Sequence, residues 1–383
     1  MKISWANPRD IIKASWPSLC ISSAVGLRPF EVCRKKIVSY LYIITILTCY
    51  YGLFYVSFDY CDKLFISLEI ICKSTKIRRF QMILNIFILP IMVISSASTS
   101  YQLKNSLLHI HNFDKKLEMF NVKLNYKENM REEAVHVFGI MIITILMGLM
   151  EYYSYTYAGT TYMYDLMWIT MQFPQIVNSV IISTFVIMLG KIRKRHGIIN
   201  NLIVDLKYLK KNEVRTIISA EIDNVFKLKL LREMYEICDN VATRVNAAYG
   251  ITLLMSIVIF VIAICAHIGV VHATFGSQID TVDFIVDTIW AFFYFGKFVY
   301  VADACHSYRA EGKRASELLH KCQVDANCHL LKQENESFAR HVSYSNIRIK
   351  ACDFFTIDYS LIVKVVVALS IYVFFLSQFS CTQ

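Results

Sequence analysis

Charged residues are scarce in this sequence. They make up 18% of the 383 residues, and apolar residues make up 56%, against about 25% and about 45–50% in ordinary soluble domains. The apolar residues fall in long blocks separated by basic stretches, which favours one polytopic membrane bundle over two or three soluble domains. The net charge of +10 is then a consequence of membrane orientation, and we expect no nucleic-acid partner.

Motifs of common enzymes and metal sites are also absent. The sequence has no phosphate-binding glycine loop, nucleophile elbow or His-Glu-x-x-His motif, so we expect neither catalysis nor a cofactor. Its 12 cysteines include no CxxC pair, and no standard metal-site spacing occurs. Cys61 and Cys72 lie in one loop and could form a disulfide. No cleavable signal peptide is expected, because Lys13 and Pro17 interrupt the first apolar run.

Seven apolar blocks are long enough to be membrane-spanning helices, which need about 18 or more residues to cross ~30 Å of hydrocarbon. The blocks cover residues 37–58, 80–100, 134–150, 166–189, 247–271, 282–301 and 361–379. Pro90 and Pro174 predict kinks in the second and fourth, because neighbouring helices can satisfy the backbone groups that proline frees. The predicted fold class is an all-α polytopic membrane protein with seven transmembrane helices.

The distribution of Lys and Arg predicts the orientation, since these residues favour the cytosolic side. With the N-terminus cytosolic and the C-terminus external, 33 of the 40 lysines and arginines fall in cytosolic segments, and five fall in the external loop 59–79. G-protein-coupled receptors have the opposite orientation, and their Asp-Arg-Tyr and Asn-Pro-x-x-Tyr signatures are missing here. A G-protein-coupled receptor is therefore the alternative prediction. The single sequon, at Asn335, falls in the last cytosolic segment and should stay unmodified.

The C-terminus carries a specific motif. The last block contains Tyr372, then five residues, then Gln378 and Phe379. This pattern resembles the signature of insect gustatory receptors, which is Thr-Tyr, five mostly hydrophobic residues and Gln-Phe; Ile371 and Ser377 depart from it. Residues 354–358 and 26–30 are similar to further family patterns.

The resemblance implies a tetrameric ligand-gated cation channel whose last helix lines a central pore. It divides the chain into a cytosolic N-terminal segment (1–36), a six-helix ligand-binding bundle (37–301) with a cytosolic helical segment (190–246), a cytosolic anchor segment (302–353), and the pore-lining seventh helix with a short external tail (354–383). The implied location is the plasma membrane of sensory neurons, which the protein crosses several times. The resemblance also implies a homo- or hetero-tetramer that conducts monovalent and divalent cations and is opened by a small-molecule tastant.

Periodicity adds residues to the predicted pore. At about 100° per residue, one stripe of the last helix contains Lys364, Ala368, Ile371, Phe375 and Gln378. Ile371 and Phe375 would form apolar constrictions that gate by dewetting, and Gln378 would form a polar ring near the external mouth. Phe379 lies about 100° away and would brace the neighbouring subunit. The alternative is a packing seam, which has the same sequence pattern.

Aromatic and polar side chains gather in the outer halves of three predicted helices, and such a mixture is usual in small-molecule sites. We predict that these side chains bind the ligand: Tyr152, Tyr155, Trp168, Gln172, Gln175, Asp283, Asp287, Trp290 and Tyr294. The alternative is that the polar members form interhelical hydrogen bonds. Carboxylates beside aromatic rings suit a partly cationic bitter compound through cation–π contact. They also suit sugars, and the bitter class is weakly preferred.

Apolar residues also recur at helical spacing among lysines in the segment that follows the fourth block, at Ile199, Leu202, Ile203 and Leu206 and again at residues 218–225. This pattern predicts amphipathic helices below the membrane.

Overall fold

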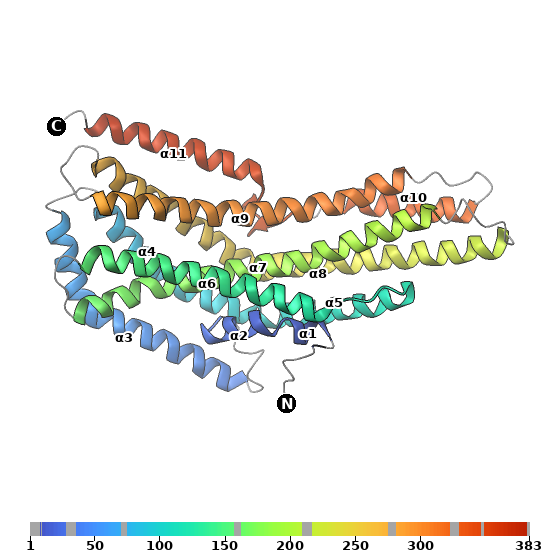
Figure 1. Cartoon of the computed structure of the whole chain (residues 1–383), viewed down its shortest axis with the longest axis horizontal. Coiled ribbons are helices and arrows are strands. Elements are labelled where there is room, and N and C mark those ends of the chain that lie inside the picture. Colours follow the sequence, from blue (N-terminus) through green and yellow to red (C-terminus); the bar gives the residue numbers. More distant parts are fainter. Residues whose placement is uncertain are drawn as a thin grey trace.

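The computed structural model describes residues 8, 10–27, 36–69, 75–156, 162–208, 217–274, 281–321, 329–345 and 348–380. Nearly all of these residues are helical (Figure 1). The elements are α1 (Ile11–Ala14), α2 (Trp16–Ala24), α3 (Lys36–Glu69), α4 (Thr75–Ser98), α5 (Ser100–Leu117), the short 3-10 helix η2 (Glu118–Phe120), α6 (Tyr126–Thr156), α7 (Tyr162–Tyr208), α8 (Ile217–Thr274), α9 (Thr281–His320), α10 (His329–Tyr344), β1 (Lys350–Ala351), β2 (Phe355–Thr356) and α11 (Tyr359–Ser380).

The membrane-spanning helices agree with the seven predicted blocks. Among the described residues, six helices are long and apolar enough to cross a membrane, and a seventh span results if α4 and α5 count as one. These two helices meet at a bend of 46°. The bend falls at Thr99, whereas the helices continue through Pro90 and Pro174. Six predicted blocks lie wholly inside one helix each, and the second ends at the α4–α5 bend.

Three of the helices are much longer than a membrane is thick. α7, α8 and α9 contain 47, 58 and 40 residues, which corresponds to about 60–90 Å at 1.5 Å per residue. The hydrocarbon layer takes up about 30 Å, so each of these helices continues well outside it. The parts of these helices beyond the hydrocarbon layer, together with α10, form the narrower end of the molecule on the right in Figure 1. We call this part the helical extension: residues 190–208, 217–246 and 302–321 together with α10.

The predicted amphipathic segment lies in the helical extension, and its first apolar stripe packs as the pattern predicts. Ile199 and Ile203 are buried, and Leu202 and Leu206 pack against the same core. Ile222, at the start of α8, is exposed. Burial of one apolar stripe between helices explains why this polar segment stays helical outside the membrane.

Two buried ion pairs connect α7 with α5 and α6 near the start of the helical extension. Arg195 on α7 donates two hydrogen bonds to Asp114 on α5, at 2.9 and 2.7 Å, and both side chains are almost fully buried. Lys191, one turn earlier, forms a 2.7 Å ion pair with Glu133 on α6. Lys191 and Arg195 are two of the lysines and arginines that follow the fourth predicted block, and both point into the bundle. Their net contribution to stability is small because burial offsets the attraction, but removing one partner would leave an uncompensated buried charge.

A small hairpin connects the helical extension to α11. β1 and β2 pair antiparallel, with Lys350 opposite Thr356, and the turn between them holds Cys352 and Asp353 at positive φ. The backbone amide of Lys350 donates to the Asn246 side chain on α8 at 2.9 Å. The hairpin thus directs the chain from α10 back to the outside of the bundle, where α11 lies next to α9 (Figure 1).

Candidate functional site

α11 packs on its own chain through one face only. That face consists of Ile362, Val365, Leu369, Tyr372 and Leu376, which are partly buried against α8 and α9 at three- and four-residue spacing. The predicted pore stripe lies on a different face, and its members Lys364, Ala368, Ile371, Phe375 and Gln378 are exposed. Ile371 and Phe375 are each 53% exposed. The packing seam within the chain is therefore not the predicted stripe.

The first turn of α11 is fastened to α9 by polar contacts. Asp358 caps the helix, since its Oδ1 accepts hydrogen bonds from the backbone amides of Ser360 and Leu361 at 3.0 and 3.3 Å. These bonds and the Ser360 hydroxyl, which contributes most, lower the pKa of the Asp358 carboxyl, and Arg309 on α9 adds to the effect. Arg309 lies 3.9 Å from the second carboxyl oxygen.

Tyr359 adds a second connection to α9. Its hydroxyl donates to Asp303 at 2.5 Å, and its ring lies 4.4 Å from the His306 ring. Movement of α9 would thus be transmitted to the start of α11. The sequence showed residues 354–358 only as a family-like pattern and did not indicate these contacts.

The predicted aromatic and acidic residues of α9 come together with α8. Asp287 Oδ1 accepts a hydrogen bond from His267 Nδ1 at 2.7 Å, which requires the proton on that ring nitrogen. The His267 ring stacks on Trp290 at 6.0 Å and on Tyr294 at 5.8 Å. All four side chains are buried, and the hydrogen bond from His267 on α8 gives Asp287 an interhelical partner. The side chain of Asp283 lies outside the described part.

A second group of predicted residues connects α6 and α7. The rings of Tyr152 and Trp168 are 5.3 Å apart, and Trp168 Nε1 donates to the carbonyl of Gly148 at 3.0 Å. Gln172 donates to Glu151 at 2.7 Å. A Cβ at position 148 would lie 2.9 Å from Gln172 side-chain atoms, so glycine allows this close approach. Tyr155 lies in α6, but its side chain is outside the described part.

Several buried polar atoms of the membrane region lack hydrogen-bond partners. Among the described residues, they include the Gln175 side-chain oxygen, both amide atoms of Asn178 and Trp290 Nε1. Interhelical hydrogen bonds therefore account for Gln172 and Asp287 but not for this set. Buried polar atoms normally find partners, and contacts among the described residues do not supply them for this set.

Lys297 is the charged residue in the middle of the bundle. Its amine donates to the Ser179 hydroxyl on α7 at 2.8 Å and lies 4.2 Å from the centre of the Phe293 ring. Within the described residues no carboxylate forms an ion pair with it. A buried charge inside the membrane is costly, so it marks a functional site by default.

A cavity of about 410 Å³ opens beside Lys297. It lies between α6, α7 and α9 and is lined by His136, Ile140, Ile143, Ser179, Ile182, Phe292, Phe293, Gly296, Lys297 and Tyr300. Aliphatic and aromatic side chains make up most of the lining, and His136, Ser179, Lys297 and Tyr300 add polar groups. Lys297 is not among the predicted ligand-binding residues, although its position three residues after Tyr294 and seven after Trp290 puts it on the same face of the helix.

These features define a multi-pass membrane protein with an apolar cavity and an unshielded last helix. The chain belongs to the 7tm chemosensory receptor family, whose pattern it matches over residues 18–383. This membership confirms the resemblance to insect chemoreceptors inferred from the C-terminal motif. No curated protein matches the sequence.

Solved structures give the same fold. The insect olfactory receptor OR5 from Machilis hrabei superimposes with a TM-score of 0.64 at 12% identity, over 89% of this chain and 90% of the receptor. The same receptor in complex with eugenol superimposes with a TM-score of 0.56 at 13% identity, over 95% and 98% of the two chains. At this identity the likeness establishes the fold alone.

Proposed function

We propose that this chain is the subunit of a ligand-gated, non-selective cation channel in the plasma membrane of sensory neurons, opened by a small-molecule tastant. The observation that carries the proposal is the exposed apolar face of α11. No residue of this span is fully buried within its own chain, so lipid or a neighbouring subunit must cover its apolar residues. Four copies arranged around an axis would bring the stripe of Ile371, Phe375 and Gln378 together as a pore.

The cavity beside Lys297 is the proposed tastant site. Its mainly apolar wall favours a hydrophobic bitter compound over a sugar, because a sugar would leave many hydroxyl groups without partners. Lys297 disfavours a cationic ligand, and the Asp287 carboxylate is hydrogen-bonded to His267 and so is not free to pair with a cation. The favoured tastant is therefore neutral or anionic. The residues around Trp168 and Trp290 would then shape the outer part of the site.

Recording currents from the full chain, expressed alone or with a partner receptor, tests the channel. We expect tastants to evoke a cation current in excised patches without GTP or added G protein. If every response requires G-protein signalling, the channel proposal fails and the chain is a G-protein-coupled receptor.

A cavity-filling substitution tests the tastant site. A side chain at Gly296 would enter open space, because no atom lies within 4 Å of a Cβ built there. Gly296→Leu should therefore fold normally and raise the half-maximal tastant concentration at least about tenfold. Gly52→Leu, on α3 and equally free of close neighbours, is the matched control and should respond as the unmodified chain does. Equal responses of both variants would contradict this location of the site.

A further inference from the structure

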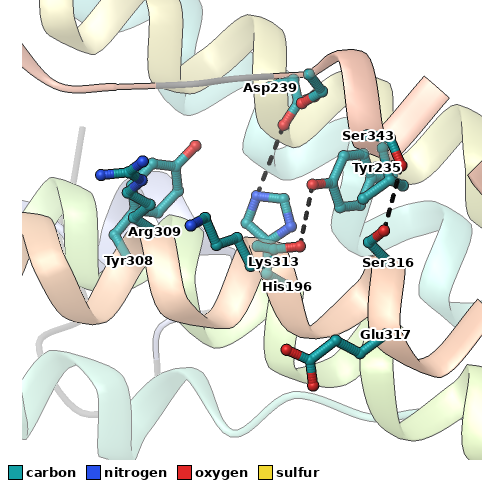
Figure 2. Close-up of a pocket in the computed structure, with 12 residues that line it drawn as sticks. His196, Tyr235, Asp239, Tyr308, Arg309, Lys313, Ser316, Glu317 and Ser343 are labelled. Atoms are coloured by element: carbon teal, nitrogen blue, oxygen red, sulfur yellow. Dashed lines mark hydrogen bonds and ion pairs between the residues drawn. The ribbon is translucent and has the colours of Figure 1, made fainter. Parts of the chain in front are cut away.

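A second cavity lies in the helical extension, away from the proposed pore and tastant site. It has a volume of about 360 Å³ and lies where α7, α8, α9 and α10 meet. Figure 2 shows His196 at its centre, Asp239 and Tyr235 on α8, and Arg309 and Lys313 on α9. The membrane-spanning parts of the helices contribute nothing to this lining, so a ligand would reach it from the aqueous phase or from the membrane surface.

The wall of this cavity contains buried polar atoms that lack hydrogen bonds. His196 is 1% exposed, and neither ring nitrogen has a hydrogen-bond partner among the described residues. The nearest acid is Asp239, whose Oδ1 lies 3.9 Å from Nε2 and is itself without a hydrogen bond. Each such group requires an explanation, because buried polar atoms are normally satisfied. A ligand with several hydroxyl groups would supply donors and acceptors to both.

Two cations occupy one side of the same cavity. Arg309 and Lys313 are four residues apart on α9, a spacing at which like charges repel. Lys313 forms no ion pair within the described residues, and Arg309 retains a buried Nε without a hydrogen bond. In Figure 2 the Lys313 amine extends toward Arg309, whereas the Glu317 carboxylate lies apart from both, below the α9 ribbon. A phosphate group between the two cations would relieve the repulsion and form charge-assisted hydrogen bonds.

We propose that the cavity between His196, Asp239, Arg309 and Lys313 binds a phosphorylated polyol, with the phosphate on the two cations and the hydroxyl groups on His196 and Asp239. Ser316 and Ser343, whose hydroxyls lie 3.3 Å apart at the edge of the cavity, supply further partners. Two sources offer this chemistry: a free sugar phosphate and the inositol phosphate headgroup of a membrane lipid.

The site is connected to α11 through Arg309, which is also the cation beside the Asp358 cap. A phosphate group carries more negative charge than a carboxylate and would draw the guanidinium away from Asp358. Occupancy would therefore loosen the connection between α9 and α11 and change the tastant sensitivity of the channel. This consequence rests on the proposed function, whereas binding itself does not.

Binding to the purified full-length chain in lipid nanodiscs tests the site without any measurement of current. The probes are glucose 6-phosphate, glucose and inorganic phosphate in solution, and phosphatidylinositol 4-phosphate incorporated in the disc, each measured by calorimetry or by competition with a labelled form. We expect glucose 6-phosphate or the inositol lipid to bind, and glucose and inorganic phosphate to bind at least about tenfold more weakly. Which of the two binds identifies the source.

A pair of charge variants locates the binding. Lys313→Gln should weaken binding of the phosphorylated probe at least about tenfold. Arg314→Gln removes a charge one residue away and is the matched control, because Arg314 is exposed and pairs instead with Glu311 at 3.6 Å; it should bind as the unmodified chain does. The proposal is overturned if neither phosphorylated probe binds, if inorganic phosphate binds equally well, or if the two variants lose binding equally. Failure of the channel proposal would leave these binding results unchanged.

Discussion

Phe375→Ala is the sharpest test of the proposed pore. The ring is 53% exposed on its own chain, which leaves about 100 Å² uncovered for a side chain that buries about 150–250 Å² when enclosed. At about 25 cal/mol per Å², hydrating that surface costs about 2.5 kcal/mol per ring and about 10 kcal/mol for four copies. Four such rings around an axis would keep a closed passage dry.

We take about a fifth of that cost, about 2 kcal/mol, as the part that favours the dry closed state over a hydrated one. Loss of the four rings would remove this preference and change the ratio of hydrated to dry channels ~30-fold. We therefore expect Phe375→Ala to raise tastant-independent current at least about tenfold. The assay is basal current normalised to surface expression.

Phe374→Ala is the matched control for this experiment. Phe374 is the same residue type on the same turn and is 58% exposed, but it lies about 100° further round the helix. It should leave basal current unchanged. Equal basal currents in the two variants would show that the stripe of Ile371, Phe375 and Gln378 does not line the pore and faces lipid instead.

Three further predictions concern selectivity, the α11 cap and orientation. Gln378→Glu should place four carboxylates near the mouth and shift the reversal potential toward that of divalent cations; an unchanged reversal potential would remove Gln378 from the pore. Asp358→Ala removes a cap worth about 1 kcal/mol and should shift the tastant concentration for half-maximal activation about fivefold. The pKa of Asp358 is lowered in the folded protein, so the stability that the cap contributes is present above the ordinary carboxyl pKa and is lost only as the pH falls through the lowered value. Activation should therefore not change through this cap when the pH varies in the neutral range. Asn335, which donates to the Leu319 carbonyl at 3.2 Å, should remain unglycosylated. Cys72→Asn creates a sequon in the loop predicted to be external and should add a glycosidase-sensitive mass. Glycosylation at Asn335 but not at position 72 would show that the topology is the opposite of the predicted one.

The sequence by itself determined the membrane class, the positions of the spans and the family. Apolar blocks of sufficient length can be read without tertiary information, because the hydrocarbon layer requires about 20 apolar residues whatever the neighbours are. The block at residues 134–150 is the shortest of the seven, because α6 begins with polar residues and ends with tyrosines that lie outside the apolar run. The C-terminal motif was readable for the same local reason, since all its residues lie on one helix.

Tertiary structure decided which polar residues share a site. Asp287 and Lys297 lie on one stripe of α9, yet Asp287 is paired with His267 on α8 and Lys297 turns to Ser179 on α7. The two cavities, the buried Lys191 and Arg195 pairs and the contact of Arg309 with Asp358 likewise join residues far apart in the chain. Periodicity shows which face of a helix a side chain occupies, but not which helix lies opposite that face. That choice depends on how all the helices pack together, because each buried charge or amide needs a partner that only a neighbouring helix can provide.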